Sequence, residues 1–391
     1  MPQVQSSVGL PCFEVREVRG HNPVEIHVRY TGSLACPHCR GDALRTKDRY
    51  LRRVRHENQG LRRSYLVIEA RKYLCRQCDR YFNQRFEGIG KWRRSTEPYR
   101  KQIVWQHTQG ISQKTLSDKE RLGSATVERW TQELMAVKLH ERRDAPCPRV
   151  LGLDEHFFTR RKGYATTLCD LQHRNVYDIT LGRSEKALEG YFVRLQSKQH
   201  VRVVCMDLAS NYRALVRKHF PKAKIVADRF HVIRLVNQRF LEVWKLLDPV
   251  GRGNRGLLSL MRRHQENLRD DQRARLRTYL RGQPALEAVY DFKQKLCRLL
   301  LKKSQKVRQC RRLIPRFLHY IRQLSESGFE PLVSLARTLG SWKEEIACMW
   351  RFTRNNGITE GFHTKMEMIS RRAFGFRNFE NYRLRVRSLC G

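Results

Sequence analysis

Three apolar stretches in the middle of the chain decide the fold: RVLGLDEHF (149–157), YATTLCDL (164–171) and NVYDITLGR (175–183). Each is rich in β-branched and aliphatic residues, and short polar or glycine-containing segments separate them. The next residues, SEKALEGYFVRL (184–195), place apolar residues at helical spacing behind Ser184, a residue type that often caps a helix. The sequence therefore predicts three consecutive strands followed by a helix.

The following stretch alternates between strand and helix patterns. VRVVCMDLA (201–209) and AKIVADRF (223–230) are predicted as strands, and NYRALVRKHF (211–220) and HVIRLVNQRFLEVWKLL (231–247) as helices. The resulting order, β-β-β-α-β-α-β-α, is that of the RNase H-like fold. Other α/β folds with a leading run of antiparallel strands share this order, but few of them place acidic residues where this chain does.

Three acidic residues lie on elements that the RNase H-like fold brings together. Asp154 lies toward the end of the first strand, Asp207 ends the fourth strand, and Glu360 lies in a predicted terminal helix. Three converging carboxylates can hold two Mg²⁺ (or Mn²⁺) ions about 3.5–4 Å apart, which activate an attacking oxygen and stabilise a leaving one. A single acid would more simply cap a helix or pair with a base. Three acids in this order favour a metal site.

One ambiguity concerns the second acid. Asp228 also ends a predicted strand and is the alternative to Asp207, which we favour because the fourth strand lies beside the first. His231 follows Asp228 by three positions, so the two side chains are expected to face each other at a helix start. We expect this pair to brace the site or orient a phosphate.

The spacing of the acids predicts an insertion. Asp154 and Asp207 are 53 positions apart, as four strands require, whereas 153 positions separate Asp207 from Glu360. Within this interval, residues 251–322 carry 20 Lys and Arg against 5 Asp and Glu, and their apolar residues recur at helical spacing. We expect basic helix faces that follow DNA phosphates, in preference to a merely solvated surface. The candidate residues are Arg308, Arg311 and Arg312.

The composition agrees with a nucleic-acid partner. The 391 residues include 79 Lys and Arg against 38 Asp and Glu, a formal charge of +41, while 40% are hydrophobic. A chain with that apolar content folds, and so large a positive charge indicates a polyanionic partner. The chain contains no run of about 18 apolar residues, so no membrane span is predicted. Its first residues also lack a signal-peptide pattern. We therefore expect a cytoplasmic, nucleoid-associated protein.

Four of the 12 cysteines form two C-x-x-C pairs. Cys36 and Cys39 make the first pair, Cys75 and Cys78 the second, with 35 residues between the inner cysteines. Thiolates at this spacing on tight turns suit a tetrahedral, structural Zn²⁺ site. A redox-active pair is the alternative, but no thioredoxin-like pattern accompanies either motif. The other cysteines are scattered, as is usual in a reducing compartment.

Residues 100–136 are predicted to form two helices around a turn at Leu122-Gly123. Ser124 is expected to cap the second helix, which in a helix-turn-helix motif enters the DNA major groove. Any short helical hairpin gives a similar pattern, but the neighbouring zinc ribbon and the nuclease-like core favour DNA binding. The candidate DNA-facing residues are Ser124, Ala125, Glu128 and Arg129, and Arg371 and Arg372 are expected to frame the acidic site. Asn356 is expected to cap the helix of Glu360.

Several long segments resemble the catalytic domain of bacterial DDE transposases of the ISL-three insertion-sequence family. They are GLDEHFFTRRKGYATTLCDL, VVCMDLASNYRALVRKHFPKAKIVADRFHVIRLVNQ and RNNGITEGFHTKMEMISRRAFGFRNFENYRLRV. The resemblance implies Mg²⁺-dependent DNA cleavage and strand transfer at the ends of a mobile element, with Asp154, Asp207 and Glu360 as the triad. Asp228-Arg229-Phe230-His231 also fits a motif of the related Mutator-like group.

The predicted organisation is multidomain α/β: an RNase H-like catalytic domain split by an all-helical insertion. The predicted domains are a zinc ribbon (1–92), a helix-turn-helix (93–147), the first catalytic part (148–240), the insertion (241–350) and the terminal catalytic helix (351–391). The expected partner is double-stranded DNA, bound by a homodimer or larger assembly because an element has two ends. The alternatives are a domesticated, non-catalytic DNA-binding protein or a structure-specific nuclease on the same fold.

Overall fold

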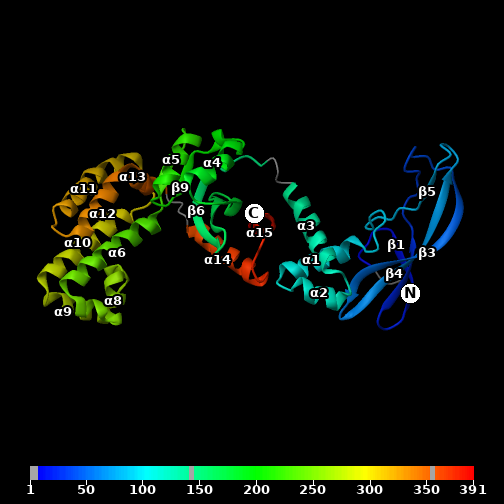
Figure 1. The fold of residues 1–391 in the computed structure, drawn as a ribbon, viewed down its shortest axis with the longest axis horizontal. Coiled ribbons are helices and arrows are strands. Elements are labelled where there is room, and N and C mark those ends of the chain that lie inside the picture. Colours follow the sequence, from blue (N-terminus) through cyan, green and yellow to red (C-terminus); the bar gives the residue numbers. More distant parts are fainter. Residues whose placement is uncertain (1–7, 141–144, 353–356) are drawn as a thin grey trace. The chain divides into compact units, whose positions relative to one another are not determined.

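The computed structural model describes residues 8–140, 145–352 and 357–391. Two compact units divide the chain, one formed by Met1–Glu141 with Ile369–Phe376, the other by Arg142–Met368 with Arg377–Gly391 (Figure 1). Asn355 and Asn356, the latter predicted to cap a helix, lie outside the described residues. Within the described ranges, no helix is long and apolar enough to cross a membrane.

The N-terminal unit begins with a five-stranded sheet. Its strands are β1 (Phe13–Arg19), β2 (Val24–Tyr30), β3 (Leu44–Gln59), β4 (Arg62–Cys75) and β5 (Tyr81–Asn83). The order is β1-β2-β4-β3, with β5 paired to β4. Val24, Ile26 and Val28 alternate along β2 and are buried, so one face of the sheet holds the core. Residues 45–51 of β3 are exposed on both faces, so this part of the β3–β4 hairpin is an open ribbon.

Three helices follow: α1 (Glu97–Thr108), α2 (Gln113–Glu120) and α3 (Ser124–His140). The sequence predicted a single helix before the turn at Leu122-Gly123, but Gly110 adopts a φ of 108° and separates α1 from α2. The prediction that Ser124 caps α3 is also wrong, because Ser124 is already helical and the Gly123 carbonyl accepts the first bond from Thr126 N–H at 2.9 Å.

A buried ion pair joins these helices to the sheet of the same unit. Arg55 of β3 donates to Glu120 at the end of α2 at 2.7 Å, and both side chains are almost fully buried. Asn58 and the Tyr99 hydroxyl also donate to Glu120, at 2.9 and 3.2 Å. Because Glu120 has partners on both sides, the sheet and the three helices pack as one body.

The second unit contains another five-stranded sheet. Its strands are β6 (Val150–Thr159), β7 (Gly163–Asp170), β8 (Asn175–Leu181), β9 (Val203–Met206) and β10 (Lys224–Ala227). Their order is β10-β9-β6-β7-β8. The first three strands in sequence are antiparallel neighbours, whereas β9 and β10 are parallel to β6. These strands agree with the five predicted from the sequence.

Helices cover this sheet and extend from it. They are α4 (Glu185–Arg194), α5 (Ser210–His219), α6 (Arg229–Leu247), α7 (Pro249–Gly253), α8 (Arg255–Arg262), α9 (Asp270–Arg281), α10 (Pro284–Leu300), α11 (Val307–Ser325), α12 (Glu330–Ser341), α13 (Lys343–Arg351), α14 (Gly357–Arg372) and α15 (Phe379–Cys390). Single 3-10 turns lie at Lys198–His200 and Gln265–Asn267. The predicted helical character of residues 241–350 is thus observed.

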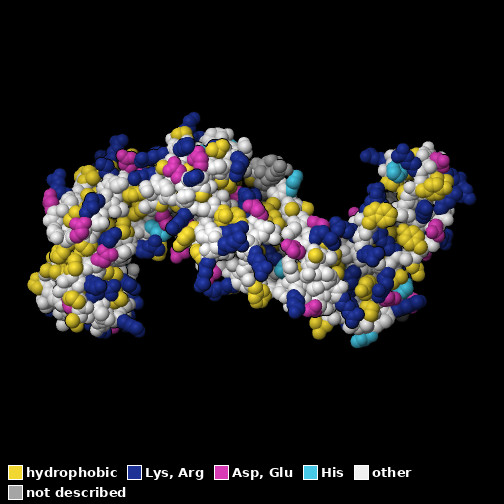
Figure 2. All heavy atoms as spheres, in the orientation of Figure 1, with side chains coloured by type: hydrophobic (Ala, Val, Ile, Leu, Met, Phe, Trp, Pro, Cys, Tyr) yellow, Lys and Arg dark blue, Asp and Glu magenta, His cyan; other side chains and the backbone are white. Residues whose placement is uncertain are grey.

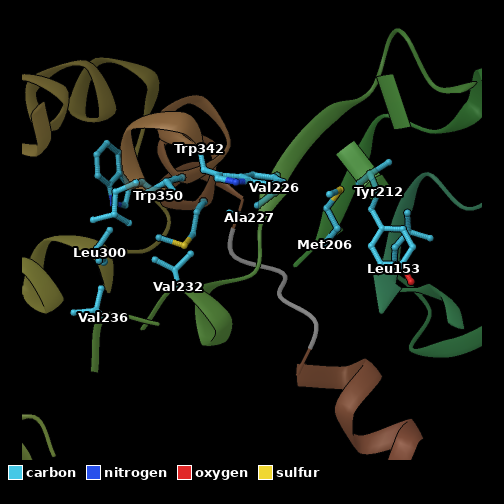
Figure 3. Packing of buried hydrophobic residues seen from close by; sticks show 14 of the residues in the cluster. Leu153, Met206, Tyr212, Val226, Ala227, Val232, Val236, Leu300, Trp342 and Trp350 are labelled. Atoms are coloured by element: carbon cyan, nitrogen blue, oxygen red, sulfur yellow. The ribbon is translucent and has the colours of Figure 1, made fainter. Parts of the chain in front are cut away.

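One hydrophobic core runs from the sheet into this helical segment (Figure 3). Leu153 of β6 and Met206 of β9 belong to the same buried cluster as Val236 of α6, Trp342 and Trp350. α13 packs directly on β10, the edge strand of the sheet. The helical segment is therefore not a separately packed domain, because it shares its hydrophobic core with the sheet.

Polar contacts reinforce both ends of this unit. Glu345 of α13 is buried and lies 3.5 Å from Arg213 and 3.3 Å from Arg217, both on α5. At the opposite edge of the sheet, Arg383 of α15 makes two hydrogen bonds to Asp178 of β8, at 2.6 and 2.8 Å. These pairs fix the helical segment and the last helix against the sheet.

Candidate functional site

The register of the parallel strands brings three aspartates to one edge of the sheet. Leu153 of β6 pairs with Met206 of β9, and Met206 pairs with Ala227 of β10. An aspartate follows each of these aligned residues: they are Asp154, Asp207 and Asp228. Three carboxylates are thus gathered across neighbouring strands, Asp154 midway along β6 and the others just beyond the ends of β9 and β10.

His231 connects two of these aspartates. Its Nδ1 lies 2.7 Å from Asp228 Oδ2 and 2.8 Å from Asp207 Oδ1. Burial lowers the pKa of His231, but hydrogen bonds to Asp207 and Asp228 and their charges outweigh it and raise the pKa to about 9. The ring is therefore protonated at neutral pH. Asp228 also caps α6 by accepting from the Phe230 N–H, which sets His231 on the first turn.

The ionisation of Asp154 is disfavoured in the folded chain. Burial and the neighbouring charge of Asp207 raise its pKa to about 7, although the N–H of Glu155 donates to Asp154 Oδ1 at 2.8 Å. A carboxylate at this position carries a free-energy cost unless a cation lies nearby. A cation bound next to Asp154 would therefore stabilise its ionised carboxylate.

A network of neutral polar groups lies on the other side of Asp154. Thr167 Oγ1 of β7 is 2.9 Å from His156 Nδ1 and 3.0 Å from His363 Nε2. His156 Nε2 is 3.1 Å from the hydroxyl of Tyr382, and His363 Nδ1 is 3.8 Å from Asp154 Oδ2. Burial lowers the pKa of His156 to about 3 and that of His363 to about 4, so both rings are neutral. The network fastens α14 and α15 beside Asp154.

The structure leaves Glu360 outside this group. Among the described residues, the group of three or more acids and histidines whose ligand atoms all lie within 4.8 Å of one another is Asp207, Asp228 and His231, so Asp154 is outside it as well. Glu360 lies in the first turn of α14 and is exposed. It precedes His363 by three positions, so the two residues are neighbours on the helix surface. α14 thus contacts the site through His363, next to the predicted acid.

The donor set fits a hard divalent cation. Carboxylate oxygens are the ligands that Mg²⁺ prefers, and Asp154 and Asp207 supply them from adjacent strands. Asp207 Oδ1 is buried and lies 2.8 Å from His231 Nδ1, which is also 2.7 Å from Asp228 Oδ2. An oxygen of this kind is a suitable cation ligand.

The predicted zinc ligands meet in the N-terminal unit. Cys36 Sγ lies 3.6 Å from Cys78 Sγ, and Cys39 Sγ lies 3.5 Å from Cys75 Sγ. A tetrahedron with Zn–S bonds of about 2.3 Å has edges of about 3.8 Å, so the four sulfurs are spaced for zinc. The residue after each second cysteine has a left-handed backbone, with φ of 64° at Arg40 and 52° at Asp79.

The two turns are thus equivalent knuckles, brought together because Cys75 ends β4 while the first pair precedes β3. Burial opposes ionisation of Cys36, but backbone N–H groups of Cys39 and His38 overcome it and lower the pKa of that thiol to about 6. The easily ionised thiol suits a metal ligand.

The predicted DNA-facing residues of α3 lie at its start. Ser124, Ala125 and Arg129 are exposed, whereas Val127 and Trp130 face the core of the three helices. Glu128 accepts a hydrogen bond from Gln132 at 3.2 Å. The helix thus presents an accessible first turn, as a recognition helix requires.

A basic groove lies beside these helices in the same unit, and the sequence did not reveal it. It encloses about 870 Å³ between β3, β5 and the loop before α1. Its lining includes many cations and aromatic rings and no acidic side chain. They include Arg52, Arg53, Tyr81, Arg85, Lys91, Trp92, Arg93 and Arg94. Trp92 is 76% exposed, and Arg93 lies 3.3 Å from Glu133 of α3.

The other predicted basic residues fall into different units. Arg308, Arg311 and Arg312 are exposed on α11 of the second unit. Arg371 and Arg372, expected to frame the acids, are exposed near the end of α14, and this end, from Ile369 on, belongs to the N-terminal unit. There the side chain of Arg372 packs beside Gly110. Figure 2 shows Lys and Arg side chains widely spread over the visible surface.

Comparison with known proteins shows the family that the chain resembles. Residues 151–386 match the ISL3 family of DDE transposases, described as "Transposase". Residues 33–78, which contain all four knuckle cysteines, match the "zinc-finger of transposase IS204/IS1001/IS1096/IS1165". The chain is 25% identical over 366 residues to the transposase for insertion sequence element IS1001 of Bordetella parapertussis, covering 91% of this chain and 88% of the relative.

The family match over the mixed sheet and its helices, together with the match over the zinc ribbon, identifies a DDE-type transposase. Because the family match spans more than half of the chain, the protein belongs to the ISL3 family. The resemblance found in the sequence is thereby confirmed, and so is the zinc ribbon. The roles of individual residues are argued below.

Proposed function

We propose that this protein binds the terminal inverted repeats of an insertion sequence and catalyses Mg²⁺-dependent DNA cleavage and strand transfer. One observation carries the proposal: three aspartates follow aligned positions of three parallel strands, with His231 between two of them. Asp228 caps α6, but Asp154 and Asp207 have no evident structural use in so basic a chain. A cation and a polyanionic substrate explain both features.

The catalytic unit is proposed to be RNase H-like. The strand order β10-β9-β6-β7-β8, with antiparallel β6, β7 and β8 and parallel β9 and β10, supports this assignment. The helices between α6 and α14 are then an insertion, and the domain boundaries 1–92, 93–147, 148–240, 241–350 and 351–391 are proposed to mark functional segments. The two structural units are larger than these segments.

Asp154 and Asp207, with Glu360 from α14, are the residues that would hold Mg²⁺. When bound, the metal supplies Lewis-acid activation of the attacking and leaving oxygens. Asp228 and the protonated His231 act as positioning residues, because they hold Asp207 through a direct contact of 2.8 Å. The neutral network of His156, Thr167 and His363 fixes the helix that carries Glu360.

The N-terminal unit is proposed to recognise the element ends. The first turn of α3 is proposed to enter the major groove, and the basic groove of the same unit to hold the DNA backbone. Both surfaces present exposed side chains, which are not needed for the hydrophobic core of the unit. The zinc ribbon supports the groove, whose lining includes Pro37 and His38 of the first knuckle. Two element ends require two active sites, so the working form is a homodimer or larger assembly on the nucleoid.

The test uses the purified protein and labelled DNA that carries the ends of the encoding insertion sequence. With Mg²⁺ we expect nicks at the element ends and none in DNA with scrambled ends. The Asp207→Asn variant is the matched control and should bind the ends without cutting them. End binding without nicks by the unaltered chain would favour the non-catalytic binding protein. Cutting of branched DNA regardless of end sequence would favour a structure-specific nuclease.

A further inference from the structure

A second groove begins beside the acidic site, and nothing so far gives it a role. It encloses about 480 Å³ along α6 and is closed on the far side by residues of α7 and α8. Its lining on α6 runs from Phe230 to Lys245 at intervals of three and four residues, so one whole stripe of the helix borders it. Fifteen helical steps correspond to about 22 Å.

The stripe differs from the buried face of the same helix. Val232, Val236 and Val243 pack into the core and hold α6 in place, whereas the groove residues Ile233 and Leu241 are only partly buried against the hydrophobic clusters. Phe230 lies at the catalytic end and leaves 47% of its surface exposed. Its ring is perpendicular to that of His231, with centroids 5.5 Å apart. The aromatic face is therefore available next to a residue that contacts Asp207.

The groove is positively charged along its length. Arg234 lies 5.7 Å from the centroid of Phe230, and the further cations are Lys245, Arg252 and Arg262. The acid in the lining, Glu242, is 2.8 Å from Arg239 on the same helix, so its charge is already neutralised. Arg252 Nε is a buried donor without a hydrogen-bond partner within the described ranges. A polyanion in the groove would meet an excess of unneutralised cations.

We propose that this groove, the α6 groove, binds a short unpaired segment of DNA next to the scissile phosphate, with Phe230 stacking on one base. The inference rests on the proposed function and extends it. A positive groove with an exposed aromatic ring is the usual means of holding single-stranded DNA, because every base has a face that stacks. A paired base has its faces covered by its neighbours, so Phe230 acts only on a base outside the duplex.

A protein helix is the competing occupant, since a stripe at this spacing also suits helix packing. The four cations disfavour that occupant, because a second copy of this chain is itself strongly basic. They favour a strand of phosphates instead. The position of Phe230 beside His231 also explains why the stripe starts at the acidic site.

The first experiment measures cleavage of element-end DNA whose flanking bases are either paired or mismatched. Phe230→Ala should slow cleavage of the paired substrate by about 5- to 100-fold, the cost of one lost base stack. The mismatch should increase the cleavage rate of Phe230→Ala more than that of the unaltered chain. In the unaltered chain the Phe230 ring already stabilises the base outside the duplex. Phe230→Trp should restore the rate. Leu246→Ala, which removes an exposed apolar side chain of α6 away from the groove, should change nothing.

The second experiment needs no cleavage. An oligodeoxythymidine of roughly 10 nucleotides should bind the full chain, and Arg262→Ala should reduce the slope of log affinity against log salt by about 0.7. Arg263→Ala is the matched control, because this exposed neighbour does not line the groove. Fluorescence of 2-aminopurine at the first flanking position should be quenched by the unaltered chain and not by Phe230→Ala.

The outcomes separate the two proposals. If the unaltered chain does not cut element ends but binds the oligonucleotide through Phe230 and Arg262, the proposed function fails and the α6 groove remains a single-strand site. If it cuts normally and Phe230→Ala, Arg262→Ala and the mismatch have no effect, the groove assignment is overturned. It is also overturned if Phe230→Ala changes only the self-association measured by light scattering.

Discussion

At the scale of single residues, the candidate active site depends on a register. Asp154, Asp207 and Asp228 meet because each follows one of three aligned strand positions. A shift of one residue in any strand would turn its side chains to the opposite face, so the hydrophobic core that fixes the register also fixes the site. Leu153 and Met206, which precede two of the acids, belong to that core.

Removing single carboxylates tests their proposed roles. Asp154→Asn, Asp207→Asn and Glu360→Gln should each reduce end-specific nicking by more than about 100-fold, since a lost metal ligand costs more than a lost supporting contact. Asp228→Asn should cost about 10- to 100-fold, as a supporting residue does. Gel-shift binding to element ends should be unchanged. Normal nicking by Asp207→Asn together with none by Asp228→Asn would reverse the assignment of the second ligand.

A buried lysine in the helical segment gives a pH-dependent prediction. Lys293 of α10 is 4% exposed, and burial lowers its pKa from 10.5 to about 8, although Nζ donates to the Met261 carbonyl. Below pH 8 both the folded and the unfolded chain carry the proton, so the folded state bears the whole cost of burying the charge. Between pH 8 and 10.5 only the unfolded chain keeps it, so stability rises with pH.

Lys293→Met should therefore stabilise the protein at pH 7, by about 2–3 kcal/mol. The advantage should shrink as the pH rises from 8 to 10.5. Urea unfolding of both chains at several pH values measures the difference, in which the other titrating groups cancel. A difference that does not change with pH would show that the pKa of Lys293 is not lowered in the folded chain.

The sequence predicted the aspartates because strand ends and acids are both visible in a local pattern. It did not predict the contacts of His156, Thr167 and Tyr382, because these residues come from three separate parts of the chain. His363 had a local signal, three positions after Glu360, that could have been used. The roles of Asp154, Asp207 and Glu360 all remain predictions, and Asp154 and Glu360 lie outside the observed cluster of Asp207, Asp228 and His231.

At the scale of elements, folding of the ribbon depends on two turns that zinc would hold together. The protein should copurify with about one zinc ion per chain, bound by the four knuckle cysteines. Cys75→Ser should abolish zinc binding and weaken end recognition, because structural zinc supplies folding free energy. Cys12→Ser, which removes an exposed cysteine of the same unit, is the control. Elemental analysis of fresh protein without zinc would contradict the site.

The buried pair of Arg55 and Glu120 should be costly to break. Glu120→Ala leaves the Arg55 charge buried without its partner and should destabilise the N-terminal unit by about 3–5 kcal/mol. Replacing both residues, as Arg55→Met with Glu120→Leu, should recover most of the loss. Zinc release during urea unfolding reports on this unit. Glu69→Ala breaks the exposed pair with Arg71 and should cost less than about 1 kcal/mol.

Elements were predicted well where the apolar pattern was regular. All five strands of the second sheet were expected, and so was the helical nature of residues 241–350. The errors arose where backbone conformation decided the outcome, as at Gly110, which separates α1 from α2. The basic groove of the N-terminal unit was not expected, because its lining comes from β3, β5 and a loop that are distant in sequence.

At the scale of the whole molecule, the excess positive charge should govern DNA affinity. Replacing Arg308, Arg311 and Arg312 with Ala should reduce the slope of log affinity against log salt by up to about three units, since each lost phosphate contact contributes about 0.9. Specific and random duplexes should weaken together. Arg129→Ala should instead weaken binding to the ends more than to random DNA. An unchanged slope after the triple substitution would make α11 a solvated spacer.

The common core of the sheet and the helical segment has a consequence for the inheritance of the gene. A copy that loses the coding region from α7 to α13 does not yield a smaller catalytic domain. Val226 and Val232, buried with Trp342 and Trp350 in the intact chain, would face water instead. The residual protein would unfold and be degraded, so such a deletion removes every activity in one event. Copies of the element with such a deletion should therefore produce no truncated protein that competes with the intact transposase for DNA.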